Sequence, residues 1–491
     1  MKIVTFTVFF CFIATALGYG ESNRLTKKDP FDLLKTVRGS GKELTVTEAQ
    51  KMALAWSPDI EKSRAAIVLV EAAASQSLVA AMPRLEFSGR YTRLSAVKNG
   101  SFYNDDPQVF TQARALAAQV TDPAARTLWQ NSIDSQEATA NFSFPIFFDQ
   151  YALRATVKFP VSEILLSALP AYRASISAEE AEQHRLKSQS AQIALNVAES
   201  YFNFARARGA HAVAMRARKS AEDRRNQIEA FVNGGRMAKL DLKRAQAQLA
   251  RAQLAETRAR ASEVLGAEGL CILLHYQPCS QIMIAERFEA NPSPLEGDKE
   301  KFLKLAYHNR PEIKAIKATI KTQKHIVSAQ RGLQYPKLDL SANMDYANPN
   351  TRIFPQQQKF RATWDVNAVL SWSPNDTFSA SATTSQAEAD LMRAGGAFRA
   401  VNDAVSLEIT QAVTAHETAR TSLAVAQEGL EAAKESYRAR VLQFEVGVAV
   451  LSDVLDADTE LSQAYLDLLN AHIDLRIAWF RLQYATGTMK L

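Results

Sequence analysis

The sequence is poor in the residues that build metal sites, disulfide scaffolds and irregular loops. It has 3 cysteines and 7 histidines among 491 residues, and no histidine stands at ligand spacing from another histidine. Glycine (18) and proline (16) are scarce, whereas alanine-rich stretches are long, which is typical of long helices. There is no Ser/His/Asp set and no phosphate-binding glycine loop, so the sequence predicts neither an enzyme nor a cofactor.

Neither positive nor negative charge dominates the sequence. Charged residues make up 22% of the chain and leave a net charge of only +6. No cluster of lysine and arginine with interleaved aromatic residues occurs, so nucleic acid is not an expected partner.

The N-terminus carries a targeting signal. Lys2 precedes an apolar run, Ile3–Leu17, and small residues follow up to Gly20. This pattern predicts a secretory signal peptide over 1–20 and an N-terminal extension over 21–42. The alternative is a membrane anchor, but the run is shorter than the ~20 residues of a spanning helix. No later run is long enough, so the mature chain is expected to have no transmembrane helix.

Export leaves two cysteines, Cys271 and Cys279, in a compartment that permits disulfides. They stand eight residues apart. A local disulfide and two separate thiols are both open interpretations.

The chain repeats one design twice. The first repeat is expected over 43–277, a linker over 278–298 and the second repeat over 299–491. The first half holds about forty more residues than the second, and we expect them in an enlarged external loop near 94–140. An offset of 253 carries Pro58 and Pro83 onto Pro311 and Pro336, and an offset of 212 carries Gly235, Asp241 and Leu249 onto Gly447, Asp453 and Leu461.

Each repeat contains two segments in which apolar and polar residues alternate, as in a strand with one face of each kind. A soluble antiparallel sheet on its own core is one interpretation. An outer-membrane β-barrel is the other, favoured by strands of ~9–11 residues with aromatic ends. Four strands cannot close a barrel, so the chain would have to oligomerise. The segments are about 83–93, 151–161, 336–346 and 364–372.

Two long helical hairpins follow the strands. The first is expected over about 167–268 with its tip at 233–238, and the second over about 378–486 with its tip at 446–450. From Val454 onward, large apolar residues and alanines alternate in a heptad repeat as far as Ala485. Helices of about 100 Å bury such seams only by packing side by side, which predicts a helical tube.

At this point the chain resembles the TolC-like outer-membrane efflux channel family (outer membrane factors). The resemblance rests on LTVTEAQKMAL…SPDI, its echo KEKFLKLAYHNRPEI, the strand entries at Pro83 and Pro336, and VGVAVLSDVLDADTEL. It implies an α+β membrane protein with a two-fold internal repeat. Three chains of four strands would form a twelve-stranded outer-membrane β-barrel, continuous with a long periplasmic α-helical coiled-coil barrel.

The implied function is the exit duct of a tripartite efflux or type I secretion system in a Gram-negative-type cell. The implied partners are two further copies of the chain, a periplasmic adaptor (membrane fusion) protein, an inner-membrane pump and outer-membrane lipid. The alternative is an exported coiled-coil scaffold or adhesion protein without transport activity, which predicts extraction without detergent and no conductance.

The resemblance also assigns residues. It places a periplasmic gate at Asp453 and Asp456, where three copies would set six carboxylates in a narrow aperture that favours cations. The alternative for both aspartates is a solvated helix start. The tyrosine and arginine of the family's latch match Phe444 and Ala449, which predicts a different closure. Possible ion-pair partners in the first hairpin are Asp241, Arg236 and Arg244, and the adaptor is expected at the turns around Gly234, Gly235 and Gly447.

Overall fold

The computed structural model describes residues 42–96, 108–140, 147–276, 282–285 and 297–490. The expected signal peptide, all but the last residue of the N-terminal extension, and Cys279 lie outside these ranges. The chain divides into two compact units, and each draws on both halves of the sequence. We call them the sheet unit (Lys62–Lys187 and Pro311–Asp403) and the hairpin unit (Met1–Glu61, Ser188–Arg310 and Ala404–Leu491).

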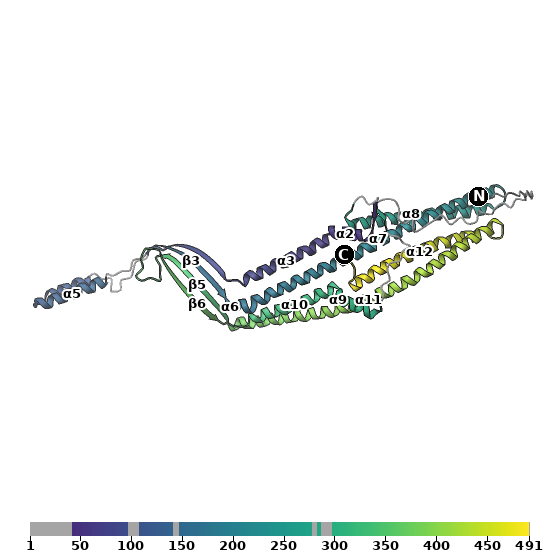
Figure 1. Cartoon of the computed structure of the whole chain (residues 1–491). Helices are drawn as coiled ribbons and strands as arrows, with labels where there is room; N and C mark the ends of the chain where they lie inside the picture. Colours follow the sequence, from purple (N-terminus) through teal and green to yellow (C-terminus); the bar gives the residue numbers. More distant parts are fainter. Residues whose placement is uncertain (1–41, 97–107, 141–146, 277–281, 286–296, 491) are drawn as a thin grey trace, which may run out of the picture. The chain divides into compact units, whose positions relative to one another are not determined.

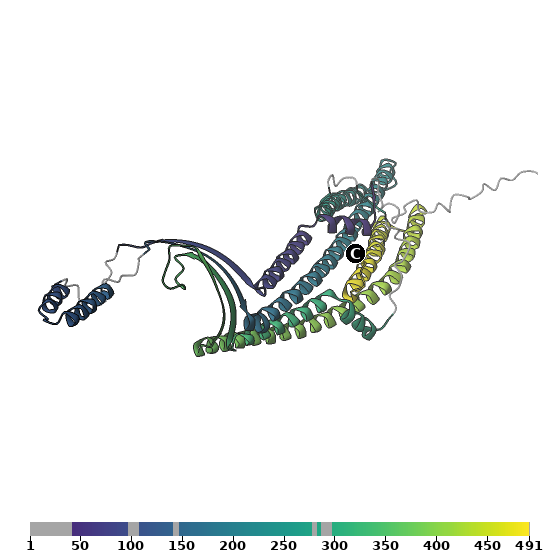
Figure 2. The same cartoon turned by 60° about the vertical axis from the view of Figure 1, so that its left-hand side comes forward.

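The sheet unit is built on one antiparallel sheet of four strands, in the order β2-β3-β5-β6. The strands lie side by side in Figures 1 and 2. They are β2 (Arg84–Arg93), β3 (Asp149–Pro160), β5 (Lys337–Asn348) and β6 (Arg361–Ser371).

Along the chain, helices precede or follow each of these strands. Two short ones, α4 and α5, stand between β2 and β3 in the segment that the repeat comparison predicts to be extra. Arg114 of α4 pairs there with Asp134 of α5 at 2.9 Å. The helices are α3 (Pro58–Ala80), α4 (Gln108–Ala118), α5 (Pro123–Ala140), α6 (Val161–Glu163), the π-helical turn η1 (Ile164–Ala168), α10 (Pro311–Gly332) and the first parts of α7 (Leu169–Asn233) and α11 (Pro374–Glu445).

The sheet is inside out for a soluble protein. Its register aligns the apolar sides of all four strands, as where Leu85 faces Val157. Those side chains are exposed, with Phe87 at 75% and Trp364 at 77%, whereas Thr156 and Asp345 of the polar side are buried. A soluble sheet would bury the apolar side instead. Of the two interpretations of the alternating segments, this arrangement fits the membrane barrel.

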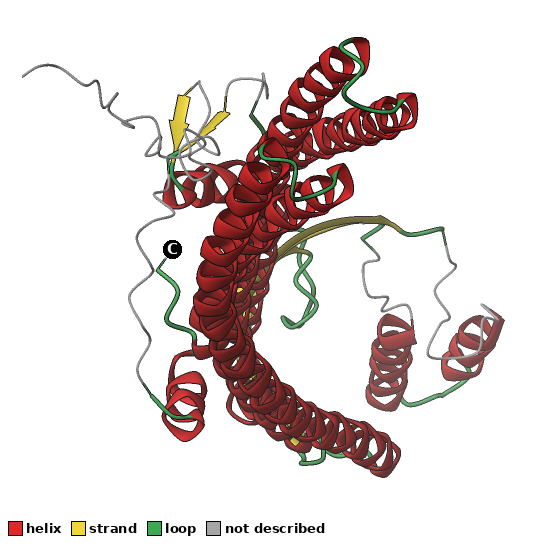
Figure 3. Ribbon diagram, turned by 90° about the vertical axis from the view of Figure 1, so that its right-hand side faces the viewer, coloured by secondary structure: helices red, strands yellow, loops and turns green. Residues whose placement is uncertain are grey.

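The hairpin unit contains the returning helices and a small sheet. Strands β1 (Lys42–Leu44) and β4 (Ile282–Ile284) pair in parallel and appear side by side in Figure 3. The Tyr201 hydroxyl donates to the Leu44 carbonyl at 2.7 Å and fixes β1 on the core. The helices are α2 (Val46–Trp56), α8 (Lys239–Leu274), α9 (Lys299–Asn309), α12 (Leu451–Thr486) and the remaining parts of α7 and α11.

Most of the heptad seam of α12 is buried, as predicted, and only Ala464 and Leu468 are partly buried. Val454 and Leu461 are 0% and 1% exposed. One side of the helix packs on α7, where Phe202 and Leu469 belong to a common core. The other side packs Leu475 on Leu423 of α11.

Among the described helices, α3 alone is long and apolar enough to cross a membrane, judged by length and composition. It stands directly before β2, and Val68 and Leu69 on it are 61% and 72% exposed.

Candidate channel gate at the helical tips

Both hairpins reverse direction through the same backbone geometry. Gly235 and Gly447 adopt left-handed φ angles of 73° and 81°, which a side chain would strain. The amide of the following residue then donates to the carbonyl five positions back: Arg236 to Phe231 and Val448 to Gln443, both at 2.8 Å. This six-to-one bond is the Schellman end of a helix, so the two tips are built alike.

Asp453 contributes to the start of α12. Its carboxylate accepts a hydrogen bond from the Val450 amide at 3.4 Å, which is half of a capping box. Asp456 lies one turn further on and is exposed. Within the described ranges neither carboxylate has an ion-pair partner, so both remain available to a charged ligand or to neighbouring copies.

An apolar cluster joins the two tips. Ile228 at the end of α7 and Leu451 at the start of α12 are buried in it. Phe444, which the resemblance matches to the latch tyrosine, packs at its edge as an apolar contact. We call this the tip cluster. Its buried members are Ile228, Ala245 and Leu451, and its partly buried members are Val232, Met237, Leu242, Phe444 and Leu455.

The basic residues of the first tip contact their own hairpin. Arg244 lies 3.7 Å from Asp241, one turn away on α8, and the Arg236 guanidinium lies 5.1 Å from the centre of the Phe231 ring. In the part of the chain that the structure describes, neither arginine pairs with Asp453 or Asp456. Ion pairing of these groups across the tips stays a prediction.

A third carboxylate near the tips, that of Asp458, was not predicted as a site residue from the sequence. It lies between α12 and α7, where the Ser220 hydroxyl donates to both its oxygens at 3.2 Å. Burial raises the pKa of Asp458, although Arg216 and Arg224 act in the opposite direction. The available signal was its place directly after the seam residue Ala457, a position that a partner helix covers.

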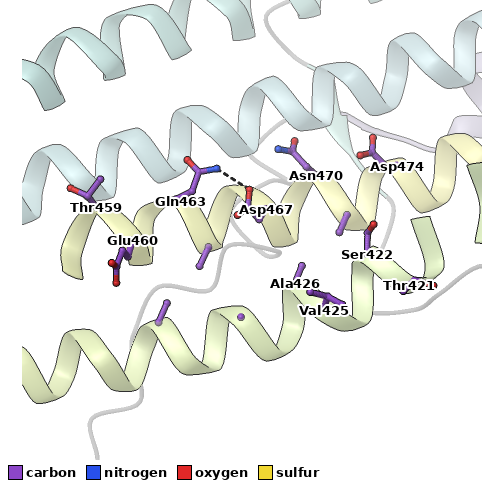
Figure 4. A pocket seen from close by; sticks show the side chains of 14 residues that line it. Thr421, Ser422, Val425, Ala426, Thr459, Glu460, Gln463, Asp467, Asn470 and Asp474 are labelled. Carbon is purple, nitrogen blue, oxygen red and sulfur yellow. Dashed lines mark hydrogen bonds between the residues drawn. The ribbon is translucent and has the colours of Figure 1, made fainter. Parts of the chain in front are cut away.

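A groove of about 870 Å³ runs between α11 and α12 (Figure 4). Its floor is made of small residues such as Ala426, Gly429 and Ala464. Polar side chains line it too, and Gln463 donates to Asp467 at 2.8 Å. Small residues let a helix approach closely, so the groove suits helix packing better than chemistry.

Cys271 is buried and disulfide-bonded. Because Cys279 lies outside the described ranges, the pairing of these two cysteines stays a prediction.

Comparison with known proteins finds a matching family model for the second half of the chain. Residues 302–488 match the model of the outer membrane efflux protein family, and the first half of the chain repeats the same order of strand, long helix, tip and helix. Residues 302–488, less than half of the chain, are thus similar to the outer membrane efflux protein family. This match agrees with the resemblance to outer-membrane efflux channels, and the matched family is one of channels and not of enzymes.

Solved structures share the fold. The outer-membrane channel OprN is 15% identical over 94% of this chain and 96% of its own, with a TM-score of 0.70. The Campylobacter jejuni CmeC outer membrane channel is 16% identical over 90% of this chain and 85% of its own, with a TM-score of 0.68. For the outer membrane protein VceC from Vibrio cholerae the values are 16%, 90%, 96% and 0.67. No curated protein matches the sequence.

Proposed function

We propose that three copies of the chain form a passive duct from the periplasm to the cell exterior. The observation that carries this proposal is the inside-out sheet, whose order leaves β2 and β6 as open edges. An unpaired strand edge is not stable in lipid. The polar side of the sheet also needs contact with water, which the lumen of a barrel provides. Pairing β2 of one copy with β6 of the next satisfies both edges, and three copies give twelve strands.

The helices support the same assembly. Leu254 and Leu265 of α8 are 50% and 73% exposed. They are large apolar side chains on the surface of an otherwise polar helix. A neighbouring copy would cover such side chains. The small-residue groove between α11 and α12 offers a second surface on which another helix packs.

The gate of this duct lies at Asp453 and Asp456. They stand three residues apart in the first turns of α12 and therefore share a face. Around the axis of a trimer they would form two rings of three carboxylates, which attract cations and repel anions. Since Phe444 and Ala449 replace the family's latch, we assign closure to the tip cluster.

The tips form the docking surface for a periplasmic adaptor. Three valines of the second tip are widely exposed: Val446 at 75%, Val448 at 77% and Val450 at 62%. Exposed apolar side chains beside Gly447, which brings no side chain of its own, suit an apolar helical hairpin as partner. The first tip offers Gly234 and Gly235 in the equivalent position. An inner-membrane pump would deliver the substrate through the adaptor.

Planar-bilayer recording tests the duct and the gate. The detergent-purified protein is compared with Asp453→Asn, Asp456→Asn and the double variant, while Asp467→Asn on the same helix serves as control. We expect small cation-selective openings in the wild type, weaker cation preference in the double variant and no change in the control. Unchanged selectivity in the double variant contradicts the gate. Protein that stays soluble without detergent and gives no conductance contradicts the duct and favours the scaffold.

A further inference from the structure

The loop between β5 and β6 spans residues 349–360, and its first part contacts the polar side of the sheet through Asn350 and Arg352, whereas Phe360 at its end stacks on Tyr346 of the apolar side. In Figure 2 this green loop hangs below the strand ends that it joins. Asn350 anchors it and is only 4% exposed. The Asn350 side-chain amide donates to the Arg361 carbonyl at 3.0 Å and to the Thr363 hydroxyl at 3.1 Å.

Arg352 fastens the loop to the sheet by charge. Its guanidinium lies 2.6 Å from Asp365 of β6 and 3.5 Å from Asp345 of β5. Asp345 also accepts from Arg154 of β3 at 2.5 Å. Two arginines and two aspartates thus connect three strands and the loop, and their charges balance within one chain.

The loop lies at the outer end of the sheet. The chain enters β5 from α10 and leaves β6 into α11, so the β5–β6 connection is at the end opposite to these helices. If the polar side of the sheet lines the lumen, as the proposed duct requires, a loop on this side narrows the exit.

We propose that the β5–β6 loop, held by Arg352 on Asp345 and Asp365, is an outer constriction that sets the size and charge selectivity of the exit. This inference rests on the proposed duct. Without Arg352 each chain would carry one uncompensated negative charge there, and a trimer three. The constriction would widen and favour cations.

Thiol labelling from outside the cell tests the constriction, because the reagent reaches the sheet without crossing the periplasmic gate. Ser341→Cys is the reporter because Ser341 lies on the polar side of β5, closer to the helices than Asp345. Small charged methanethiosulfonates and a bulky polyethylene-glycol maleimide are applied to whole cells. The chain without the reporter corrects for other thiols, and the amount of trimer in the outer membrane corrects for folding.

Two variants separate size from charge. With Arg352→Gln we expect the bulky reagent to gain access, and the cationic reagent to gain about tenfold over the anionic one through steering by the freed carboxylates. With Asp365→Asn we expect the bulky reagent to gain access while the charge preference moves toward the anion. Arg361→Gln removes a guanidinium on the same side of the sheet that has no ion pair within the described ranges, so it should shift the charge preference toward the cation without admitting the bulky reagent.

The outcomes are distinguishable. If small reagents label the reporter and the bulky one labels wild type and Arg352→Gln at equal rates, the constriction is wrong and the duct stands. If even the small reagents fail to label the reporter, the polar side does not line an open lumen, and the duct fails together with the constriction.

Discussion

Replacing Ile228 by alanine should loosen the second tip, although Ile228 belongs to the first hairpin. Ile228 is 0% exposed and packs in the tip cluster with Leu451 of α12. Truncation of a buried isoleucine to alanine costs about 2–5 kcal/mol, and truncation to valine about 0.5–1.5 kcal/mol. Since about 1.4 kcal/mol is a factor of ten, local opening should rise by roughly 30-fold or more for Ile228→Ala. For Ile228→Val the same conversion gives about 2-fold to 13-fold.

Hydrogen exchange of the detergent-solubilised protein, read by mass spectrometry, measures this opening. The informative peptide covers 446–456, in the hairpin that is not mutated. Faster exchange there in Ile228→Ala, a smaller effect in Ile228→Val and no effect of the exposed Val425→Ala on α11 would support coupling of the tips. If exchange accelerates only in the first hairpin, around 225–240, the tip cluster does not couple the tips and cannot hold the gate closed.

Three further predictions concern the two units. Gly332→Ala should destabilise the protein by about 1–3 kcal/mol, because its Cβ would overlap a backbone carbonyl of η1. Gly395→Ala in open space on α11 should stabilise it by about 0.5–1 kcal/mol, and thermal unfolding in detergent compares the two. Because burial raises the pKa of Asp458, ionisation destabilises the native state, so Asp458→Asn should raise the unfolding temperature at neutral pH and lose this advantage as the pH falls below the native pKa. On the sheet, Val366→Arg should cost about 2–4 kcal/mol and prevent assembly in the outer membrane, whereas Asn367→Arg on the polar side should assemble normally.

Strands and helices could be predicted because each has its own period in the sequence. Phe87 and Trp364 belong to apolar sets with a period of two, and the structure places both sets on the exposed side. The α12 seam has a period of seven and is mostly buried. These patterns are local, so they need no knowledge of which segments meet.

Contacts between distant segments could not be predicted in this way. Asp458 is partly buried against α7, where Ser220, 238 positions away in the sequence, donates to it. The first part of the β5–β6 loop lies on the polar side of the sheet because Arg352 pairs with two aspartates on neighbouring strands. The spacing of residues along the sequence predicts neither of these two contacts. The glycine turns gave the place of the tips, but not the cluster that joins them, since Ile228 is one apolar residue among many on α7.

The departure from the family's latch that the resemblance implies at Phe444 and Ala449 has a physical consequence for the proposed gate. A latch made of a hydroxyl, a guanidinium and a carboxylate is electrostatic and weakens as salt screens it. The tip cluster is apolar, and burial of apolar surface is not screened by simple ions. The wild-type channel should therefore stay closed as often in 1 M as in 0.1 M potassium chloride in bilayer recordings, whereas Ile228→Ala should open more often at both. An open probability that rises steeply with salt in the wild type would show that charged groups hold the tips together after all, and Arg236 and Arg244 would be the first residues to replace.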